Sequence, residues 1–172
     1  MKTLVTDRLI IRRMTTSTVD AQFMLQLLND ASWIRYIGDR GVRTEEDARQ
    51  YIAVGPMDMY DRLGYGFCIV ESRKSMCALG ICGLAKRDYL DHPDIGFAFL
   101  PQHRGQGYAY EAALATLRYA ANDLGMPRLV ATTRTDNLSS QALLRKLGLQ
   151  FERTFQHPDG DRVLQLYATP SI

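Results

Sequence analysis

The chain has 172 residues, a formal net charge of +2 and 23% charged residues. Chains of about 100–200 residues usually fold as one domain, so we expect residues 1–172 to form a single domain. Because the charge is nearly balanced and 46% of the residues are hydrophobic, the composition argues against disorder and against an electrostatic nucleic-acid binder.

The cysteines and histidines indicate the compartment of the protein and whether it binds a metal. The three cysteines Cys68, Cys77 and Cys82 are an odd number, and no signal peptide pattern precedes them, which predicts free thiols in a reducing compartment. The three histidines show no metal-ligand spacing. No apolar run approaches the ~20 residues of a membrane span. These features predict a cytoplasmic protein without a metal or a membrane anchor, which uses a diffusible cofactor if it is an enzyme.

Hydrophobic periodicity predicts the elements of the first half of the chain. They are, in order, a strand at 9–11, a helix over 19–29, an irregular segment at 33–38, a helix from 44 to about 54, and two neighbouring strands at 65–71 and 78–85. The second of these helices begins with a cap and an acidic first turn, and Gly55 and Pro56 end it.

The second half alternates strands and helices. The elements are a strand at 94–100, a helix over 108–122, a strand at 129–133, a helix over 138–147, and two strands at 150–155 and 162–167. This order predicts a mixed α/β (α+β) fold with helices on both faces of the sheet. The strand–helix–strand unit from 94 to 133 predicts a parallel crossover.

A glycine-rich segment, residues 104–109, lies between a strand that ends at a proline and an alanine-rich helix. The P-loop pattern is absent, and the dinucleotide fingerprint requires a third glycine where Tyr110 stands. The pattern [Q/R]xxGx[G/A] is met by Arg104, Gly107 and Ala109. Glycines and unpaired amides at a helix start favour a diphosphate site. An ordinary glycine-rich turn that caps a helix is the alternative.

This segment and four others resemble the GNAT superfamily of N-acetyltransferases, over nearly the whole chain. The matching segments are Thr6–Arg12, Ile95–Pro101, Arg104–Glu111, Asn137–Ser140 and Leu147–Leu149. The details look most like the RimJ/RimL branch, whose best-known members acetylate protein N-termini. The resemblance implies the GNAT fold: a mixed, mostly antiparallel sheet of about six to seven strands, splayed between strands 4 and 5 and flanked by about four helices.

The resemblance also implies that acetyl-CoA enters the gap between the splayed strands. The backbone of Phe97, Ala98 and Phe99 would then pair with the pantetheine arm. The pyrophosphate would lie on the amides of Gly105, Gln106, Gly107, Tyr108, Ala109 and Tyr110. Arg104 would add charge, or it is a solvated loop arginine.

Asn137 and Ser140 complete the implied cofactor set. Asn137 commonly reaches the pantetheine in this family, and its alternative role is a helix cap. A serine at the position of Ser140 lies near the thioester sulfur in the RimJ/RimL branch, and local hydrogen bonding is the alternative.

Asp94 and Ser140 are the catalytic candidates. The amine must be neutral to attack the thioester, yet free amines have pKa values of about 8–10, so a base is useful. Asp94 begins the strand that leads to the thioester, where the family often has a glutamate, although an ordinary strand-end aspartate is the alternative. A tyrosine acid and a glutamate base that are common in the family are replaced here by Leu144 and Thr132. Catalysis then rests on Asp94 with Ser140, or mostly on proximity and orientation.

The acceptor side is the least readable part of the sequence. By resemblance, the first two helices, their connection and the turn at 156–161 form the acceptor cleft. Trp33 and Tyr36 would line it, or they are core aromatics. Three acidic residues would attract a cationic amine, or they are solvated acids: Asp58, Asp61 and Asp91.

These observations predict an acetyl-CoA-dependent N-acetyltransferase that acts on a primary amine, either a protein N-terminus or a small molecule, through a ternary complex. A non-catalytic acyl-CoA-binding or regulatory module on the same fold is the main alternative, since the family's tyrosine and second glutamate are missing. A protein–protein adaptor that binds no nucleotide is a weaker third hypothesis, because the glycine motif is intact. The expected protein is a monomer or a homodimer with no nucleic-acid, membrane or metal partner.

Overall fold

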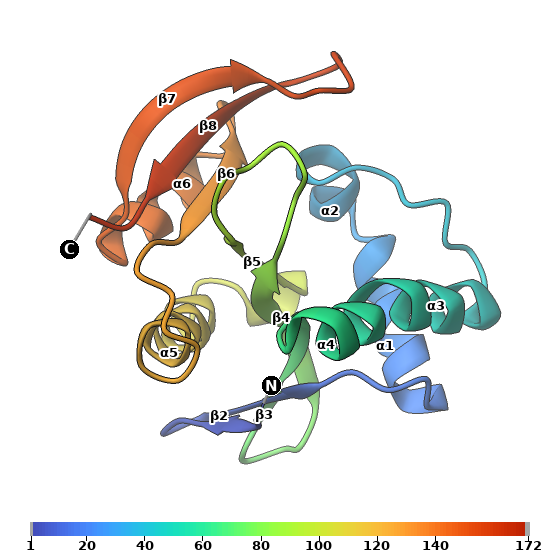
Figure 1. Cartoon of the computed structure of the whole chain (residues 1–172). Coiled ribbons are helices and arrows are strands. Elements are labelled where there is room, and N and C mark those ends of the chain that lie inside the picture. Colours follow the sequence, from blue (N-terminus) through green and yellow to red (C-terminus); the bar gives the residue numbers. More distant parts are fainter. Residues whose placement is uncertain (1, 171–172) are drawn as a thin grey trace.

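The computed structural model describes residues 2–170. Within this range one sheet has eight strands in the order β1-β2-β3-β4-β5-β6-β8-β7 (Figure 1). The strands are β1 (Leu4–Val5), β2 (Leu9–Arg13), β3 (Phe67–Ser72), β4 (Ala78–Ala85), β5 (Asp94–Phe99), β6 (Val130–Arg134), β7 (Gln150–Gln156) and β8 (Val163–Ala168). Neighbouring strands are antiparallel except β5 and β6, which are parallel. The predicted mixed, mostly antiparallel sheet is confirmed, and the short edge strand β1 gives it eight strands where about six to seven were expected.

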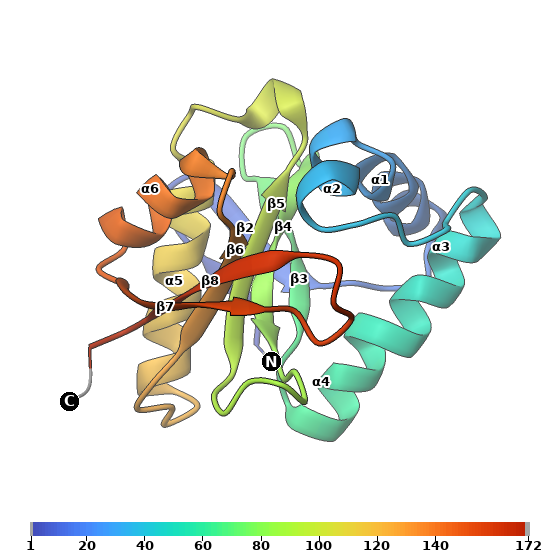
Figure 2. The same ribbon diagram turned by 90° about the horizontal axis from the view of Figure 1, so that it is seen from above.

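Helices cover both faces of this sheet. They are α1 (Thr18–Leu28), α2 (Ala31–Tyr36), α3 (Glu45–Ile52), α4 (Asp58–Leu63), α5 (Tyr108–Asn122) and α6 (Leu138–Lys146). Figure 2 shows α5 and α6 on one side of the strands and the four N-terminal helices on the other. The sheet is therefore the middle layer of three.

Alternating strand residues fill two hydrophobic cores. Cys68 and Cys82 belong to the core under α5, whereas Ile69 and Ile81 belong to the core under α1, α2 and α3. Successive strand side chains point to opposite faces, so β3 and β4 at the middle of the sheet contribute to both cores. The Cys82 thiol lies 3.5 Å from the hydroxyl of Thr116 on α5. Cys82 is therefore a packing residue of this core.

Two local predictions were wrong, and both concern the N-terminal helices. Residues 33–38 were expected to be irregular, but α2 forms there because the Asp30 side chain caps it by accepting a hydrogen bond from the Ser32 amide. The next helix was expected to end near Val54. Instead the wide π-helical turn Ala53–Met57 links α3 to α4 and contains Pro56. A wider turn provides room for the proline ring, which would clash with a regular helix.

The sheet opens between β5 and β6, which are the fourth and fifth of the predicted strands. Their register has one pair, Asp94 with Val130, and the Val130 amide donates to the Pro93 carbonyl at 3.0 Å. Beyond this point β6 continues with β8, and β5 continues with β4. The predicted splay is confirmed, and it leaves a fork whose base is Asp94.

Candidate active site

The β5 side of the fork is formed by backbone. All six residues of β5 pair with β4 along one edge, while the edge toward β6 has a strand partner at Asp94 alone. Phe97 and Ala98 are half-buried there, and Phe99 is buried. An extended strand leaves alternate amides and carbonyls pointing away from its partner. This edge can therefore pair with an extended ligand chain.

The glycine-rich turn lies between β5 and α5. Pro101–His103 forms a 3₁₀ turn, and Gly105 and Gly107 then adopt positive φ angles of 72° and 80°. Gly107 is the N-cap of α5, and no side chain of the described residues caps this end of the helix. A Cβ added to Gly105 would meet no atom within 4 Å. Amides without partners at the positive end of a 15-residue helix form a site for an anion.

Arg104 has partners on three sides. Its Nε donates to the Phe99 carbonyl at 2.8 Å, its Nη1 to the Ser32 hydroxyl at 2.8 Å, and its Nη2 to Asp30 at 2.9 Å. It therefore ties the glycine-rich turn to the start of α2. The predicted contribution of Arg104 to anion binding stays a prediction, and sequence reasoning missed Asp30 as its partner.

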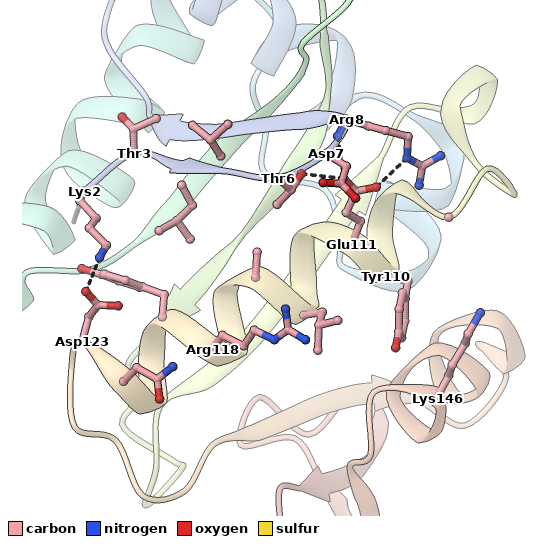
Figure 3. A pocket seen from close by; sticks show the side chains of 17 residues that line it. Lys2, Thr3, Thr6, Asp7, Arg8, Tyr110, Glu111, Arg118, Asp123 and Lys146 are labelled. Carbon is pink, nitrogen blue, oxygen red and sulfur yellow. Dashed lines mark hydrogen bonds and ion pairs between the residues drawn. The ribbon is translucent and has the colours of Figure 1, made fainter.

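Arg8 holds the same turn from the other side. Its Nη1 donates to the Gln106 carbonyl at 2.9 Å, and its Nε lies 2.6 Å from Glu111 on α5. Thr6 also donates to Glu111, at 2.6 Å. Figure 3 shows these side chains at one end of a hollow of about 780 Å³ between β1 and α5. This hollow runs along the outer side of α5 and reaches the glycine-rich turn at Gly107, so the contacts of Arg8 and Thr6 at that end position the turn.

Asn137 and Ser140 stand at the start of α6, which follows β6. The Asn137 Oδ1 accepts hydrogen bonds from the Ser140 amide at 3.2 Å and from the Ser139 hydroxyl at 3.1 Å, so Asn137 is a helix cap. The Asn137 side-chain amide and the half-buried Ser140 hydroxyl have no hydrogen-bond partner among residues 2–170. Both groups are available to a ligand, and their predicted roles stay predictions.

Asp94 lies at the base of the fork with its side chain 3% exposed. The Arg87 Nε donates to its Oδ2 at 2.5 Å. Burial raises the pKa of Asp94 above its ordinary value, and the Arg87 guanidinium and the backbone amide of Thr132 on β6 oppose that rise. A carboxylate with a raised pKa in a cleft is suited to proton transfer. Sequence reasoning missed Arg87, because no pattern links two positions that meet only when the β4–β5 connection folds back.

The two aromatic residues predicted to line the acceptor cleft differ in their burial. Trp33 is 5% exposed in the core under α1, α2 and α3, and its Nε1 has no hydrogen-bond partner within the described chain. Tyr36 is half-buried, and the Arg35 guanidinium lies 4.9 Å from its ring centre. Their roles in acceptor binding stay predictions, and Trp33 has a packing role in any case.

The remaining candidates lie outside the fork. Asp58 pairs with Arg62 on the surface of α4, and Asp61 and Asp91 are exposed. Burial raises the pKa of the Cys82 thiol to about 12, which leaves it inert as a nucleophile. No helix within residues 2–170 is long and apolar enough to cross a membrane. Nor does that range contain a group of three or more histidine, cysteine or acidic side chains placed to hold a metal ion.

Comparison with known proteins identifies the family. The sequence profile of the acetyltransferase (GNAT) domain matches residues 8–150. YnaD of Bacillus subtilis, described as an uncharacterised N-acetyltransferase, is 30% identical over 151 residues, which are 88% of this chain and 84% of YnaD. YoaA of the same organism, described in the same words, is 28% identical over 160 residues, 90% of this chain and 88% of YoaA.

Solved structures agree with the sequence matches. A GNAT-family acetyltransferase of Bacillus anthracis is 26% identical and superposes with a TM-score of 0.79, covering 97% of each chain. RimL, a ribosomal L7/L12 alpha-N-protein acetyltransferase solved with coenzyme A, shares the fold at 22% identity, with a TM-score of 0.83 and coverage of 99% of this chain and 98% of that one. The forked sheet, the glycine-rich turn and these matches make the chain an acetyltransferase enzyme that belongs to the GNAT family.

Proposed function

We propose that this protein is an acetyl-CoA-dependent N-acetyltransferase of the RimJ/RimL-like branch, which acetylates a primary amine. The observation that carries the proposal is the fork. An unpaired strand edge, an uncapped helix start and a buried carboxylate lie on consecutive segments around one opening in the sheet. The acceptor is a protein N-terminus or a small-molecule amine.

The residues of the fork fit the parts of acetyl-CoA. The edge of β5 without a strand partner, at Phe97, Ala98 and Phe99, suits the amide-bearing pantetheine arm, although Arg104 already donates to the Phe99 carbonyl. The amides from Gly105 to Tyr110 suit the pyrophosphate, because the described side chains leave this helix start uncapped and the turn has open space beside Gly105. The free side-chain amide of Asn137 adds a donor from the β6 side. Acetyl-CoA, when bound, supplies the activated acetyl group.

The proposed reaction is direct transfer within a ternary complex. The amine nitrogen forms a bond to the acetyl carbon as the carbon–sulfur bond breaks, and CoA leaves as a thiolate. One proton leaves the amine and one proton reaches the thiolate, so no oxidant or metal is needed. Asp94 is the proposed base that takes the amine proton, directly or through a water. Ser140 is the proposed donor for the thiolate, since its hydroxyl has no partner within residues 2–170.

Two measurements on the purified protein test this function. Calorimetric titration with CoA is expected to show one site per chain, with thermal stabilisation that grows with CoA concentration. A panel of amines and N-terminal peptides with acetyl-CoA is expected to release CoA thiol in an amine-dependent manner. Binding without release across the whole panel would instead identify a non-catalytic acyl-CoA-binding module. Absence of binding would exclude both.

A further inference from the structure

Arg87 comes from the connection between β4 and β5, and this connection folds back on itself. Ala85 at the end of β4 is the register partner of Asp94 at the start of β5. Lys86 closes the loop between them by donating to the carbonyls of Leu90 at 2.9 Å and Asp91 at 3.2 Å. Arg87 therefore begins two residues beyond the partner of Asp94, and its guanidinium reaches the Asp94 carboxylate.

The ion pair between Arg87 and Asp94 lies at the base of the fork, and its carboxylate is buried. The side chain of Asp94 is 3% exposed and that of Arg87 is 33% exposed. The backbone amide of Thr132 favours the ionised form of the same carboxylate from the β6 side of the opening. An ionised carboxylate that is buried without a partner is strongly disfavoured. Removal of Arg87 is therefore expected to favour the protonated form of Asp94.

No second charged side chain of the described residues acts on Asp94. Tyr89 and Tyr51 face Arg87 from the same connection and from α3, and both phenols are more weakly acidic than usual because burial raises their pKa values. Arg162 on the β7–β8 hairpin acts on Tyr89 rather than on Asp94. Arg87 alone therefore opposes the burial of the Asp94 carboxylate with a full charge.

We propose that Arg87 is a positioning residue for acetyl transfer: it holds the Asp94 carboxylate in one orientation at the base of the fork and keeps it ionised, ready to take a proton from the acceptor amine. The proposal rests on the function given above, in which Asp94 is the base. Arg87 itself touches neither acetyl-CoA nor the reacting atoms in this role. Its effect is transmitted through Asp94 alone.

The test is the pH profile of kcat for the Arg87→Met variant at saturating acceptor, where free amine ionisation no longer contributes. A neighbouring cation lowers the pKa of a carboxyl by about 1–3 units, so loss of Arg87 raises it. Asp94 then becomes protonated at higher pH, and the acid limb of the profile is expected to move up by roughly 1–3 pH units. The Arg87→Lys variant keeps the charge and is expected to move the limb less.

Arg40→Gln is the matched control, since Arg40 is an exposed cation that acts on Tyr51 and not on Asp94. Its acid limb is expected to coincide with that of the wild-type protein. An unmoved limb in an Arg87→Met variant that folds and binds CoA normally would overturn the proposal. If Arg87→Met does not fold, Arg87→Gln, which keeps a hydrogen-bond donor but removes the charge, takes its place: a wild-type limb in that variant would overturn the proposal. Absence of acetyl transfer by the wild-type protein would instead overturn the proposed function.

Discussion

Arg104 and Asp30 form an ion pair of 2.9 Å between the glycine-rich turn and the cap of α2. The Asp30 side chain is 6% exposed, and its second function is to cap α2 through the Ser32 amide. The arginine of the cofactor motif thus also organises a helix on the opposite face of the sheet. This link couples the turn proposed to bind pyrophosphate to the segment proposed to form the acceptor cleft.

Arg104→Ala is therefore expected to destabilise the fold as well as weaken CoA binding. Loss of the guanidinium leaves the buried Asp30 carboxylate without its partner, at a cost of about 1–2 kcal/mol, the lower part of the usual range because Arg104 is 40% exposed. Denaturant unfolding without ligand measures this cost. Unchanged stability would show that the ion pair contributes nothing to the fold.

Comparison of Gly105→Ala with Gly125→Ala separates an effect on anion binding from the effect of backbone strain on stability. Gly105 and Gly125 both have positive φ angles, 72° and 62°, and neither would bring a new Cβ within 4 Å of another atom. Alanine at either position costs about 1–2 kcal/mol of stability. Calorimetry is expected to show weaker CoA binding for Gly105→Ala, by roughly tenfold, and unchanged binding for Gly125→Ala. Equal CoA affinity in the two variants would show that the glycine-rich turn does not bind CoA.

Asp94→Asn and Ser140→Ala test the two proposed proton carriers. Loss of a general base or acid typically lowers turnover by about 10²–10⁴-fold. Steady-state kinetics is expected to show this loss in kcat, while calorimetric affinity for CoA changes by much less. If both variants turn over at the wild-type rate, catalysis rests on proximity and orientation and neither residue transfers a proton.

The buried network around Asp20 predicts a dependence of stability on pH. Burial opposes ionisation of Asp20, but hydrogen bonds from Arg12 and Thr15 outweigh it and hold its pKa below 3.8. A depressed pKa contributes stability above the unfolded value of 3.8, and this contribution is lost as the pH falls through the lower folded value. Asp20→Asn is expected to cost about 3 kcal/mol at pH 7, since it breaks a buried pair.

The same substitution is expected to cost less at pH 3, because the wild-type protein has by then lost part of this contribution. Denaturant unfolding of both proteins at the two pH values gives the comparison. A cost that stays constant or grows toward pH 3 would contradict the assignment of the stabilisation to ionised Asp20.

The cysteines predict one reactive thiol per chain. Burial raises the pKa of Cys68 to about 11 and that of Cys82 to about 12, whereas Cys77 is exposed. Alkylation at pH 8 followed by mass spectrometry is expected to label Cys77 first, and the other two only after unfolding. Rapid labelling of Cys82 in the folded protein would show that the β3–β4 core opens locally.

The sequence predicts the segment around the glycine-rich turn well, because local signals coincide there. Residues 108–122 were predicted as a helix and form α5 with those bounds, since the glycine-rich turn starts it and its alanines face the core. In contrast, α2 depends on the Asp30 cap that Arg104 holds from 74 residues away. The continuation of α3 through Pro56 depends on a π-helical turn that no propensity indicates.

The candidate site could also be predicted only in part, where the information was local in the sequence. Asp94 could be placed at the base of the fork because it begins a strand beside the glycine motif. Arg87 could not be assigned to it, because their contact depends on the fold of the β4–β5 connection and on the register of Ala85 with Asp94. The burial of Trp33 likewise depends on how α1, α2 and α3 pack, which local periodicity does not specify.

Acetyl transfer itself is tested most directly by the mass of the acceptor. The purified protein is incubated with acetyl-CoA carrying an isotopically labelled acetyl group and with the acceptor that gives most thiol release. We predict that one labelled acetyl group appears on the acceptor amine for each CoA released, and that Asp94→Asn slows both together. CoA release without a labelled acceptor, or equal labelling in the absence of the protein, would contradict the assignment of this fork as the centre of an N-acetyltransferase.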